Sequence, residues 1–437
     1  MPARRDHNLF MKFFRDALFA LLISAGFFLL LEGGLRLAHA HYQASFYQTE
    51  QERRFSLRPN AVGWNVSENE VYIRINGDGM RDHERPVSRP PSTLRVALLG
   101  SSEAEGRQVP LEKTFASVLE RHLNQALSQQ GSQVDVMNFA VNGYTFSQNY
   151  LTLHNHVWKY DPQIVILVIS VPNFFKNTRE LNWGDPNIPF YVLRNGQLVP
   201  DETTRAASPL NRWRLYWKNR FSDLMNRSTL LTLFNEATNK AIDGLQKEQH
   251  VLSTKLRRTP TATASPTLPA GYPYMPDLPN TQEAWAIGEG FLELMRQECS
   301  ARGAEFWIVS ADQDMQSHPS LEERARYASK LHVDSLEASD LRVQRFGEAH
   351  GIPVVLLAPF MGDYAAAHDV ALHGFPATPF DSDPWPYATG HWNELGDELA
   401  GSFVARQVLQ RSSVVRRRES LATTTGVPQV HGLEGNP

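Results

Sequence analysis

Residues 94–100, LRVALLG, run directly into Ser101 and Ser102 and then into the acidic stretch EAEG at 103–106. The apolar run predicts a short buried strand, with the two serines at its carboxyl end. Open α/β sheets carry their chemistry at the carboxyl ends of their strands. The stretch therefore has two interpretations: a strand that ends in an ordinary polar loop, or a strand that presents a nucleophilic serine.

Strand-like and helix-like patterns alternate along most of the chain that follows. A helical stripe of apolar residues comes directly after this first strand, and further strands and helices succeed each other in turn. The predicted helices lie at 114–127, 146–160, 283–303, 341–351 and 393–409, and the predicted strands after the first at 134–139, 164–171, 305–310 and 353–357. Five strands that alternate with helices predict an α/β fold, a flavodoxin-like parallel five-stranded sheet with helices on both faces.

The segments outside this alternation define the expected domain organisation. We expect an N-terminal extension with short strands at 41–93 and an α/β domain at 94–411. An insertion at about 174–281 interrupts that domain, and it includes a Pro/Thr/Ala-rich connector at 259–280. Residues 412–437 are expected to form a disordered tail.

The first 40 residues combine basic residues with an apolar segment at 17–31. The basic residues that precede this segment are Arg4, Arg5, Lys12 and Arg15. One interpretation is a signal peptide cleaved after 38–40, AHA; the other, which we favour because of the long basic lead and of Glu32 and Arg36, is an uncleaved transmembrane signal anchor. Either way the positive-inside rule predicts that the body lies outside the cytoplasm, periplasmic or extracellular, and the anchor would make it a single-pass inner-membrane protein.

Composition restricts the class of protein further. The chain has 437 residues, of which 42% are hydrophobic and 21% charged, so it can bury a sizeable core. A formal net charge of −4 without a long basic run in the body predicts no nucleic-acid partner. The single cysteine, Cys299, cannot form an internal disulfide, and its helical context predicts a buried structural thiol.

Two apparent motifs do not support other chemistries. His154 and His156 are two residues apart on a predicted helix and face different ways, which argues against a metal-binding pair. Glu103 and Glu105 lie in one turn and cannot face each other across a sugar, so we expect a solvated loop there and no glycosidase pair. The sequence predicts neither a metal nor a cofactor.

A base for Ser102 is needed, because a hydroxyl alone is a weak nucleophile. The best candidate is His391, just ahead of the last helix, for which Asn393 is the predicted N-cap. A helix dipole at this place would keep the imidazole neutral and able to accept a proton. Gly143 and Asn173, after the second and third strands, are donor types that an oxyanion hole uses.

Serine, glycine, asparagine and histidine in this order, each at the end of a successive structural unit, resemble the SGNH (GDSL-like) hydrolase family. The resemblance runs from about Leu94 to Val408, and RINGDGMRD at 74–82 is similar to the lead-in of membrane-anchored members.

The resemblance implies a role for each of these residues. Ser102 would be the nucleophile, with its own N–H as one oxyanion donor, and His391 would be the base. Gly143 and Asn173 would be the other two oxyanion donors. Ser101 stands where the family usually has aspartate.

The acid of the triad is missing from its usual place. The family usually carries it two or three residues before the histidine, where this chain has Thr389 and Ala388. The preceding loop offers Asp383 or Asp381 as replacements.

Together these features favour a membrane-anchored, extracytoplasmic serine esterase that removes O-acyl groups, acetyl above all, from cell-surface carbohydrate. Its partners would be an acylated small molecule or polysaccharide and the membrane. Two alternatives remain: a polysaccharide O-acyltransferase served by a membrane acyl-donor protein, and a non-catalytic SGNH-like binding or assembly protein that has lost the acid.

Overall fold

The computed structural model describes residues 3–38, 44–128, 131–182, 188–201, 209–235, 237–238, 268–269, 271–376 and 388–424. The chain forms two compact units. One comprises Met1–Ser45 with Trp217–Thr259, and the other comprises Phe46–Tyr216 with Pro260–Pro437. All candidate catalytic residues belong to the second unit.

The second unit is built on a parallel five-stranded sheet in the order β11-β10-β7-β5-β6. The strands are β5 (Thr93–Leu99), β6 (Gln133–Asn138), β7 (Ile164–Ile169), β10 (Glu305–Ser310) and β11 (Val354–Leu356). Counted along the chain, the first strand lies between the second and the third, which is the flavodoxin-like order. The predicted fold class is confirmed.

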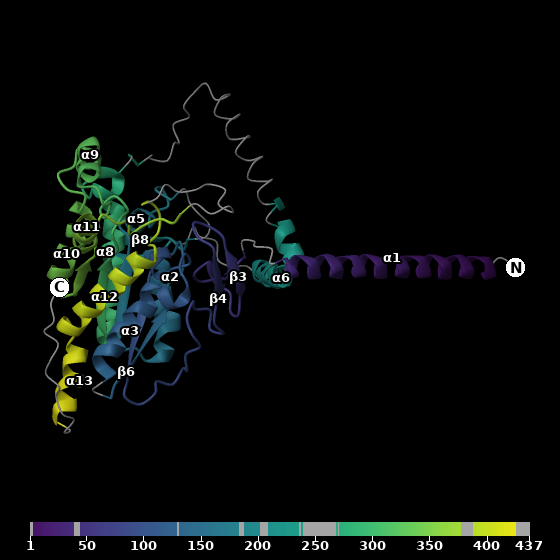
Figure 1. Cartoon of the computed structure of the whole chain (residues 1–437), viewed down its shortest axis with the longest axis horizontal. Helices are drawn as coiled ribbons and strands as arrows, with labels where there is room; N and C mark the ends of the chain where they lie inside the picture. Colours follow the sequence, from purple (N-terminus) through teal and green to yellow (C-terminus); the bar gives the residue numbers. More distant parts are fainter. Residues whose placement is uncertain are drawn as a thin grey trace. The chain divides into compact units, whose positions relative to one another are not determined.

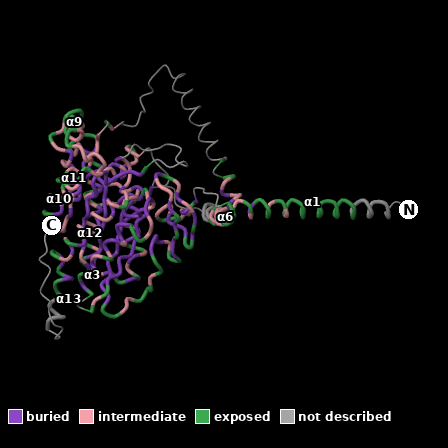
Figure 2. The backbone as a smooth tube through the Cα atoms, viewed as in Figure 1, coloured by how far each residue is buried: buried purple, intermediate pink, exposed green. Residues whose placement is uncertain are grey.

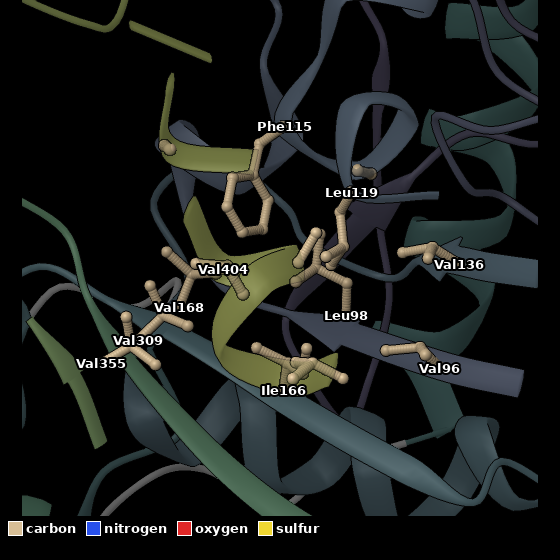
Figure 3. Packing of buried hydrophobic residues seen from close by; sticks show 14 of the residues in the cluster. Val96, Leu98, Phe115, Leu119, Val136, Ile166, Val168, Val309, Val355 and Val404 are labelled. Carbon is tan, nitrogen blue, oxygen red and sulfur yellow. The ribbon is translucent and has the colours of Figure 1, made fainter. Parts of the chain in front are cut away.

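Helices cover both faces of this sheet, as parallel strands require. Val96 and Leu98 of β5 point into one buried cluster, while Ala97 and Leu99 point into the other. Figure 3 shows the first cluster, in which Phe115, Leu119 and Val404 pack over the strand residues. The helices on this face are α3 (Phe115–Leu127), α11 (Ala358–His368) and α12 (Glu394–Arg411), and those on the opposite face are α4 (Phe146–Thr152), α8 (Gln282–Ala301) and α10 (Ala338–His350).

The N-terminal extension adds two antiparallel hairpins to this unit. β1 (Tyr47–Thr49) pairs with β2 (Phe55–Leu57), and β3 (Val62–Asn65) pairs with β4 (Val71–Arg74). The turn between β3 and β4 carries a residue of the site described below.

The interruption between β7 and α8 contains short elements. After α5 (Pro172–Phe175), β8 (Tyr191–Arg194) and β9 (Gln197–Pro200) form a hairpin, and α6 (Pro209–Asn226) follows. The predicted connector at 259–280 lies largely outside the described residues. Helix α9 (Leu321–Leu331) follows β10.

The expected disordered tail was wrong for residues 412–424. Helix α13 (Ser413–Thr424) follows α12, and Val415 is completely buried. Glu305 fixes the start of α13, because its carboxylate accepts hydrogen bonds from the Ser412 hydroxyl at 2.8 Å and the Val414 N–H at 2.9 Å. The arginine run suggested a solvated tail, but the apolar pair ahead of it packs into the core.

In the first unit, α1 (Ala3–Leu37) is exposed along most of its length (Figure 2). Within the described residues, Met11–Leu37 is the helix that is long and apolar enough to cross a membrane. Such a helix near the N-terminus is either a membrane anchor or a signal sequence.

Candidate active site

The turn that follows β5 is tight and admits only glycine at its first position. A Cβ atom on Gly100 would lie 2.8 Å from the Cβ of Ala104 and 3.0 Å from the carbonyl oxygen of Val168. Ser101 precedes the short helix α2 (Ser102–Glu105), so the backbone turns sharply from strand to helix and places Ser102 in the first helical position.

The two adjacent serines differ in exposure and in their partners. Ser101 is buried, with 4% of its surface exposed, and its hydroxyl accepts a hydrogen bond from Asn173 Nδ2 at 3.1 Å. Ser102 is partly exposed. Both hydroxyls donate to Oε2 of Glu103, each at 3.1 Å. Of the two, Ser102 is the one that a substrate can reach.

The acid partner of His391 is Glu68, which the sequence did not suggest. Nδ1 of His391 lies 2.7 Å from Oε1 of Glu68, and the backbone N–H of His391 donates to Oε2 at 3.1 Å. Glu68 therefore holds both the ring and the main chain of His391. Nε2, the other ring nitrogen, has no hydrogen-bond partner among the described residues, so it is open to take up a proton.

The turn that carries Glu68 is braced by asparagines. Glu68 has a positive φ of 66°, a conformation that glutamate rarely adopts. Asn65 Nδ2 donates to the carbonyls of Ser67 and Asn69, at 2.9 and 3.1 Å. Asn69 Nδ2 in turn donates to the carbonyl of Gln108 at 2.8 Å, which ties the turn to the segment just after α2.

The carboxylates near His391 raise the pKa of its imidazole. Burial lowers the pKa of His391, but the hydrogen bond to Glu68 and the negative charge of Glu103 outweigh it, so the pKa lies above its ordinary value. Burial raises the pKa of Glu68, yet its contacts with His391 bring it below the usual value. The expectation that a helix dipole keeps His391 neutral left out this carboxylate, whose contact acts in the opposite direction. Asn393 is confirmed as the N-cap of α12.

Ser102 and His391 make no hydrogen bond to each other within the described part of the chain. Glu103 acts on both residues: its carboxylate accepts a hydrogen bond from Ser102, and its charge contributes to the raised pKa of His391. Gln108 Nε2 also lies 3.1 Å from Nδ1 of His391. The segment from Ser102 to Gln108 thus contacts both halves of the site.

The two predicted oxyanion donors, Gly143 in the loop after β6 and Asn173 in the short helix α5, lie in segments that contact the residues around Ser102. Gly143 is exposed and has a φ of 81°, which glycine adopts without strain. Its neighbour Asn142 donates its N–H to the carboxylate of Glu105 in α2. Asn173 is buried, and its side-chain amide donates one hydrogen to Ser101. An amide nitrogen carries two hydrogens, so the second can be donated to another acceptor.

Glu105 corrects the expectation of a solvated loop after Ser102. Its side chain is completely buried and accepts a hydrogen bond from the Tyr47 hydroxyl at 3.3 Å. The buried guanidinium of Arg81 donates to the carbonyls of Glu105, Gly106 and Val109, so the N-terminal extension also fixes the end of α2. Arg81 belongs to the stretch RINGDGMRD at 74–82, for which the sequence had predicted only a strand and a tight turn.

A second histidine–acid pair lies beside the His391 loop. His373 Nε2 lies 2.9 Å from Asp312, and its Nδ1 lies 2.8 Å from the carbonyl oxygen of Gly390. The Trp392 indole donates to Asp312 at 2.8 Å, and the Gly374 N–H donates to the carbonyl of His391 at 2.9 Å. This pair therefore holds the residues on either side of His391.

The acids suggested by the sequence, Asp383 and Asp381, lie outside the described residues. The ring nitrogen that such an acid would bind, Nδ1 of His391, is bonded to Glu68. Glu68 lies 323 residues before His391, in the turn between β3 and β4, and no local pattern marks it. Cys299 is buried, as predicted, and burial raises its pKa.

A separate cleft of about 250 Å³ lies between the extension and the region after β6. Arg53, Asp78 and Lys159 are among its lining residues, whereas Ser102 and His391 are not. The cleft is therefore distinct from the candidate active site.

No family model matches the chain, and no curated protein matches it. Among solved structures, it is similar to LAE5, an α/β hydrolase enzyme from the metagenome of Lake Arreo, Spain, with 10% identity over 74% of this chain and 96% of that one and a TM-score of 0.34. A member of the lipolytic protein G-D-S-L family from Veillonella parvula has 10% identity over 73% and 99% of the two chains and a TM-score of 0.32. The acetyl xylan esterase AlAXEase has 11% identity over 73% and 100%, with a TM-score of 0.33. Similarity of this extent does not identify a reaction, which has to be argued from the site.

Proposed function

We propose that this protein is a serine esterase of the SGNH type, with Ser102 as nucleophile, His391 as general base and Glu68 as the acid of the triad. The observation that carries the proposal is the Glu68–His391 pair. A carboxylate 2.7 Å from Nδ1 fixes the tautomer that leaves Nε2 free to accept a proton. The adjacent serine on a strand-to-helix turn supplies the hydroxyl.

In the first step the Ser102 hydroxyl turns from Glu103 toward His391 and attacks the acyl carbonyl. Nε2 of His391 takes the proton, and Glu68 stabilises the imidazolium through the Nδ1–H hydrogen bond. The carbonyl π electrons move to the oxygen and form a tetrahedral oxyanion.

The oxyanion would be held by three donors. These are the backbone N–H of Ser102, the backbone N–H of Gly143 and the second side-chain hydrogen of Asn173. The imidazolium of His391 then gives its proton to the leaving alcohol, and the carbon–oxygen bond breaks to leave an acyl group on Ser102.

Water completes the cycle. His391 removes a proton from the water as it attacks the acyl-enzyme, and the collapse of the second tetrahedral intermediate returns the proton to Ser102 and releases the acid. A sugar hydroxyl in place of water would give transfer instead, through the same acyl-enzyme.

The proposed substrate is an O-acetyl ester on carbohydrate outside the cytoplasm, and α1 would keep the enzyme on the membrane. The contacts of Glu32 support an uncleaved anchor. Its carboxylate accepts hydrogen bonds from Ser228 Oγ at 2.8 Å, the Thr229 N–H at 3.0 Å and the Leu230 N–H at 2.9 Å. Cleavage after residue 40 would remove this buried acceptor and leave those donors without it.

The test is labelling of the full chain in detergent with a fluorophosphonate, together with turnover of an aryl acetate. We expect wild type to be labelled and Ser102→Ala and His391→Ala to be unlabelled. Glu68→Gln should lower turnover by roughly 10³ to 10⁴, as loss of the acid does in serine proteases. Asp383→Asn is the matched control and should leave turnover near wild type.

Absence of labelling in a folded wild-type chain would contradict the esterase and favour a non-catalytic role. Equal losses in Glu68→Gln and Asp383→Asn would contradict the assignment of Glu68. Acetylated sugar as the main product, when a polysaccharide is added, would change the reaction from hydrolysis to transfer without changing the site.

A further inference from the structure

Helix α6 exposes its aromatic face and covers its polar one. Trp217, Phe221 and Leu224 are spaced by four and three residues and so lie on one side of the helix. Their side chains are exposed by 54, 63 and 59%. Ser222 and Asp223 are only half-exposed. A helix that packs on a soluble core shows the opposite arrangement.

Two side chains of α1, Glu32 and Arg36, bind the residues just after α6, and one side chain of α6 binds the backbone at Ser45. Glu32 accepts from the segment 228–230, as described above, and Arg36 Nη2 donates to the carbonyl of Arg227 at 2.7 Å. Asn226 Nδ2 donates to the carbonyl of Ser45 at 2.7 Å, just after α1. Figure 1 shows α6 next to the carboxyl end of α1, and these residues all belong to the first unit.

The point of attachment corresponds to the edge of a bilayer. About 20 helical residues cross the hydrocarbon region. The uninterrupted apolar run of α1, residues 17–31, ends directly before Glu32, within the candidate span Met11–Leu37. The carboxyl end of α6 is therefore tied to α1 where the anchor would leave the hydrocarbon.

The composition of α6 fits that position. Tryptophan and other aromatic side chains are enriched at membrane interfaces, and cations beside them interact with anionic headgroups. Lys218, Arg220 and Arg227 are exposed on the same segment. Only Asp223 carries a negative charge within α6.

We propose that α6 lies on the surface of the bilayer that α1 crosses, with Trp217, Phe221 and Leu224 in the headgroup region. The inference rests on the membrane anchor of the proposed function, and it adds a second, interfacial contact. The enzyme would then be held at the membrane by two elements, a spanning helix and a surface helix.

The test uses single-cysteine variants of the full chain reconstituted in vesicles of phosphatidylcholine with about one quarter phosphatidylglycerol, a composition that carries negative surface charge. Each variant carries an environment-sensitive nitrobenzoxadiazole probe, and quenching by a lipid with a doxyl group near the headgroup is measured. Phe221→Cys reports the aromatic face, Ser222→Cys the opposite face, and Leu22→Cys the anchor. Wild type is the background control, because Cys299 is buried and should not react.

We expect at least about threefold stronger quenching for the Phe221→Cys probe than for the Ser222→Cys probe, because only the aromatic face would enter the headgroup region. Equal quenching of the two would overturn the assignment of the face. A Phe221→Cys probe with blue-shifted emission but no lipid quenching would overturn the proposal in favour of a protein partner or a second copy.

The Leu22→Cys probe tests the membrane anchor separately from the surface helix. Its quenching by a deeply placed doxyl group, without quenching of the Phe221→Cys probe, would overturn the surface helix and leave the anchor intact. Absence of quenching at both positions would overturn the anchor and the surface helix together. Turnover of an aryl acetate by the same preparations reports separately on the esterase.

Discussion

Two of the histidine–carboxylate pairs among the described residues have similar geometry but very different surroundings. Glu68 contacts His391 at 2.7 Å, and Asp312 contacts His373 at 2.9 Å. The side chain of His391 is 24% exposed, whereas that of His373 is 4% exposed. His391 uses one ring nitrogen and leaves the other open, whereas both nitrogens of His373 face acceptors.

The difference shows which pair can do chemistry. A histidine that faces a carboxylate and a carbonyl must carry both protons to satisfy them, so His373 is a fixed cation. Burial lowers its pKa, but the charge of Asp312 and the hydrogen bonds raise it to about 9. His391 has an open nitrogen and partial exposure, and it can exchange a proton with a substrate. In the proposed mechanism the Glu68–His391 pair takes part in the reaction, and the Asp312–His373 pair fixes the loop that carries His391.

The largest expected effect separates the two histidines directly. His391→Ala should reduce turnover of an aryl acetate by roughly 10⁶, as loss of a triad residue does in subtilisin. His373→Asn should leave turnover of the folded fraction within roughly tenfold of wild type, because His373 only helps to position the loop that carries His391. Similar losses of turnover in the two folded variants would contradict the different roles assigned to His391 and His373.

Substitutions of the two carboxylates, Glu68 and Asp312, should also differ in their effect on turnover. Glu68→Gln is expected to lose roughly 10³ to 10⁴ in turnover, because the imidazolium loses its stabilising charge. Asp312→Asn should cost far less turnover but more stability, since it leaves the buried cation of His373 without its partner. Turnover and the midpoint of chemical unfolding, measured on both variants, decide between these outcomes.

The proposed oxyanion donors near Ser102 give a further test of the site that contains Glu68 and His391. Asn173→Ala should lower turnover by roughly 10² to 10³ while the fold is kept, because it removes one preorganised donor. Ser101→Ala is the matched control, as it removes the partner of Asn173 and leaves the amide in place. An unchanged rate in Asn173→Ala would exclude the residue from the oxyanion hole.

The smallest effect concerns stability and pH. The pKa of His373 is raised in the folded state, so its stabilising contribution is complete below about pH 6.5 and is lost as the pH rises through about 9. The full loss would be on the order of 3 kcal/mol, from 1.36 kcal/mol per unit of pKa. Denaturant unfolding at pH 6 and pH 10 should show this difference in wild type and not in His373→Asn. The same pH dependence in both proteins would contradict the charged state of His373.

The sequence predicted the parts of the site that local patterns specify. The apolar runs identified the five strands, and the strand-to-helix turn identified Ser102 as a candidate. His391 could be placed because it directly precedes a capped helix. The parallel sheet then brings the ends of β5, β6 and β7 to one edge, where Ser102, Gly143 and Asn173 follow.

Glu68 could not be predicted in the same way. It lies in a turn of the N-terminal extension, and only the packing of that extension against the segment after α2 brings it to His391. The search for an acid near His391 in the sequence led to Asp383 and Asp381, because spacing along the chain carries no information about a contact between the β3–β4 turn and the segment before α12. Glu105 was missed for a similar reason, since its burial depends on Tyr47 in the extension.

The pH dependence of kcat/KM for an aryl acetate, compared between wild type and Glu68→Gln, tests most directly whether the N-terminal extension supplies the acid. The base must be neutral to act, so activity should rise with pH through the pKa of His391. In wild type this inflection should lie above pH 6.5, because the contact with Glu68 outweighs the effect of burial. In Glu68→Gln it should move to lower pH along with the loss of turnover. The same inflection in both proteins would contradict Glu68 as the acid of the triad.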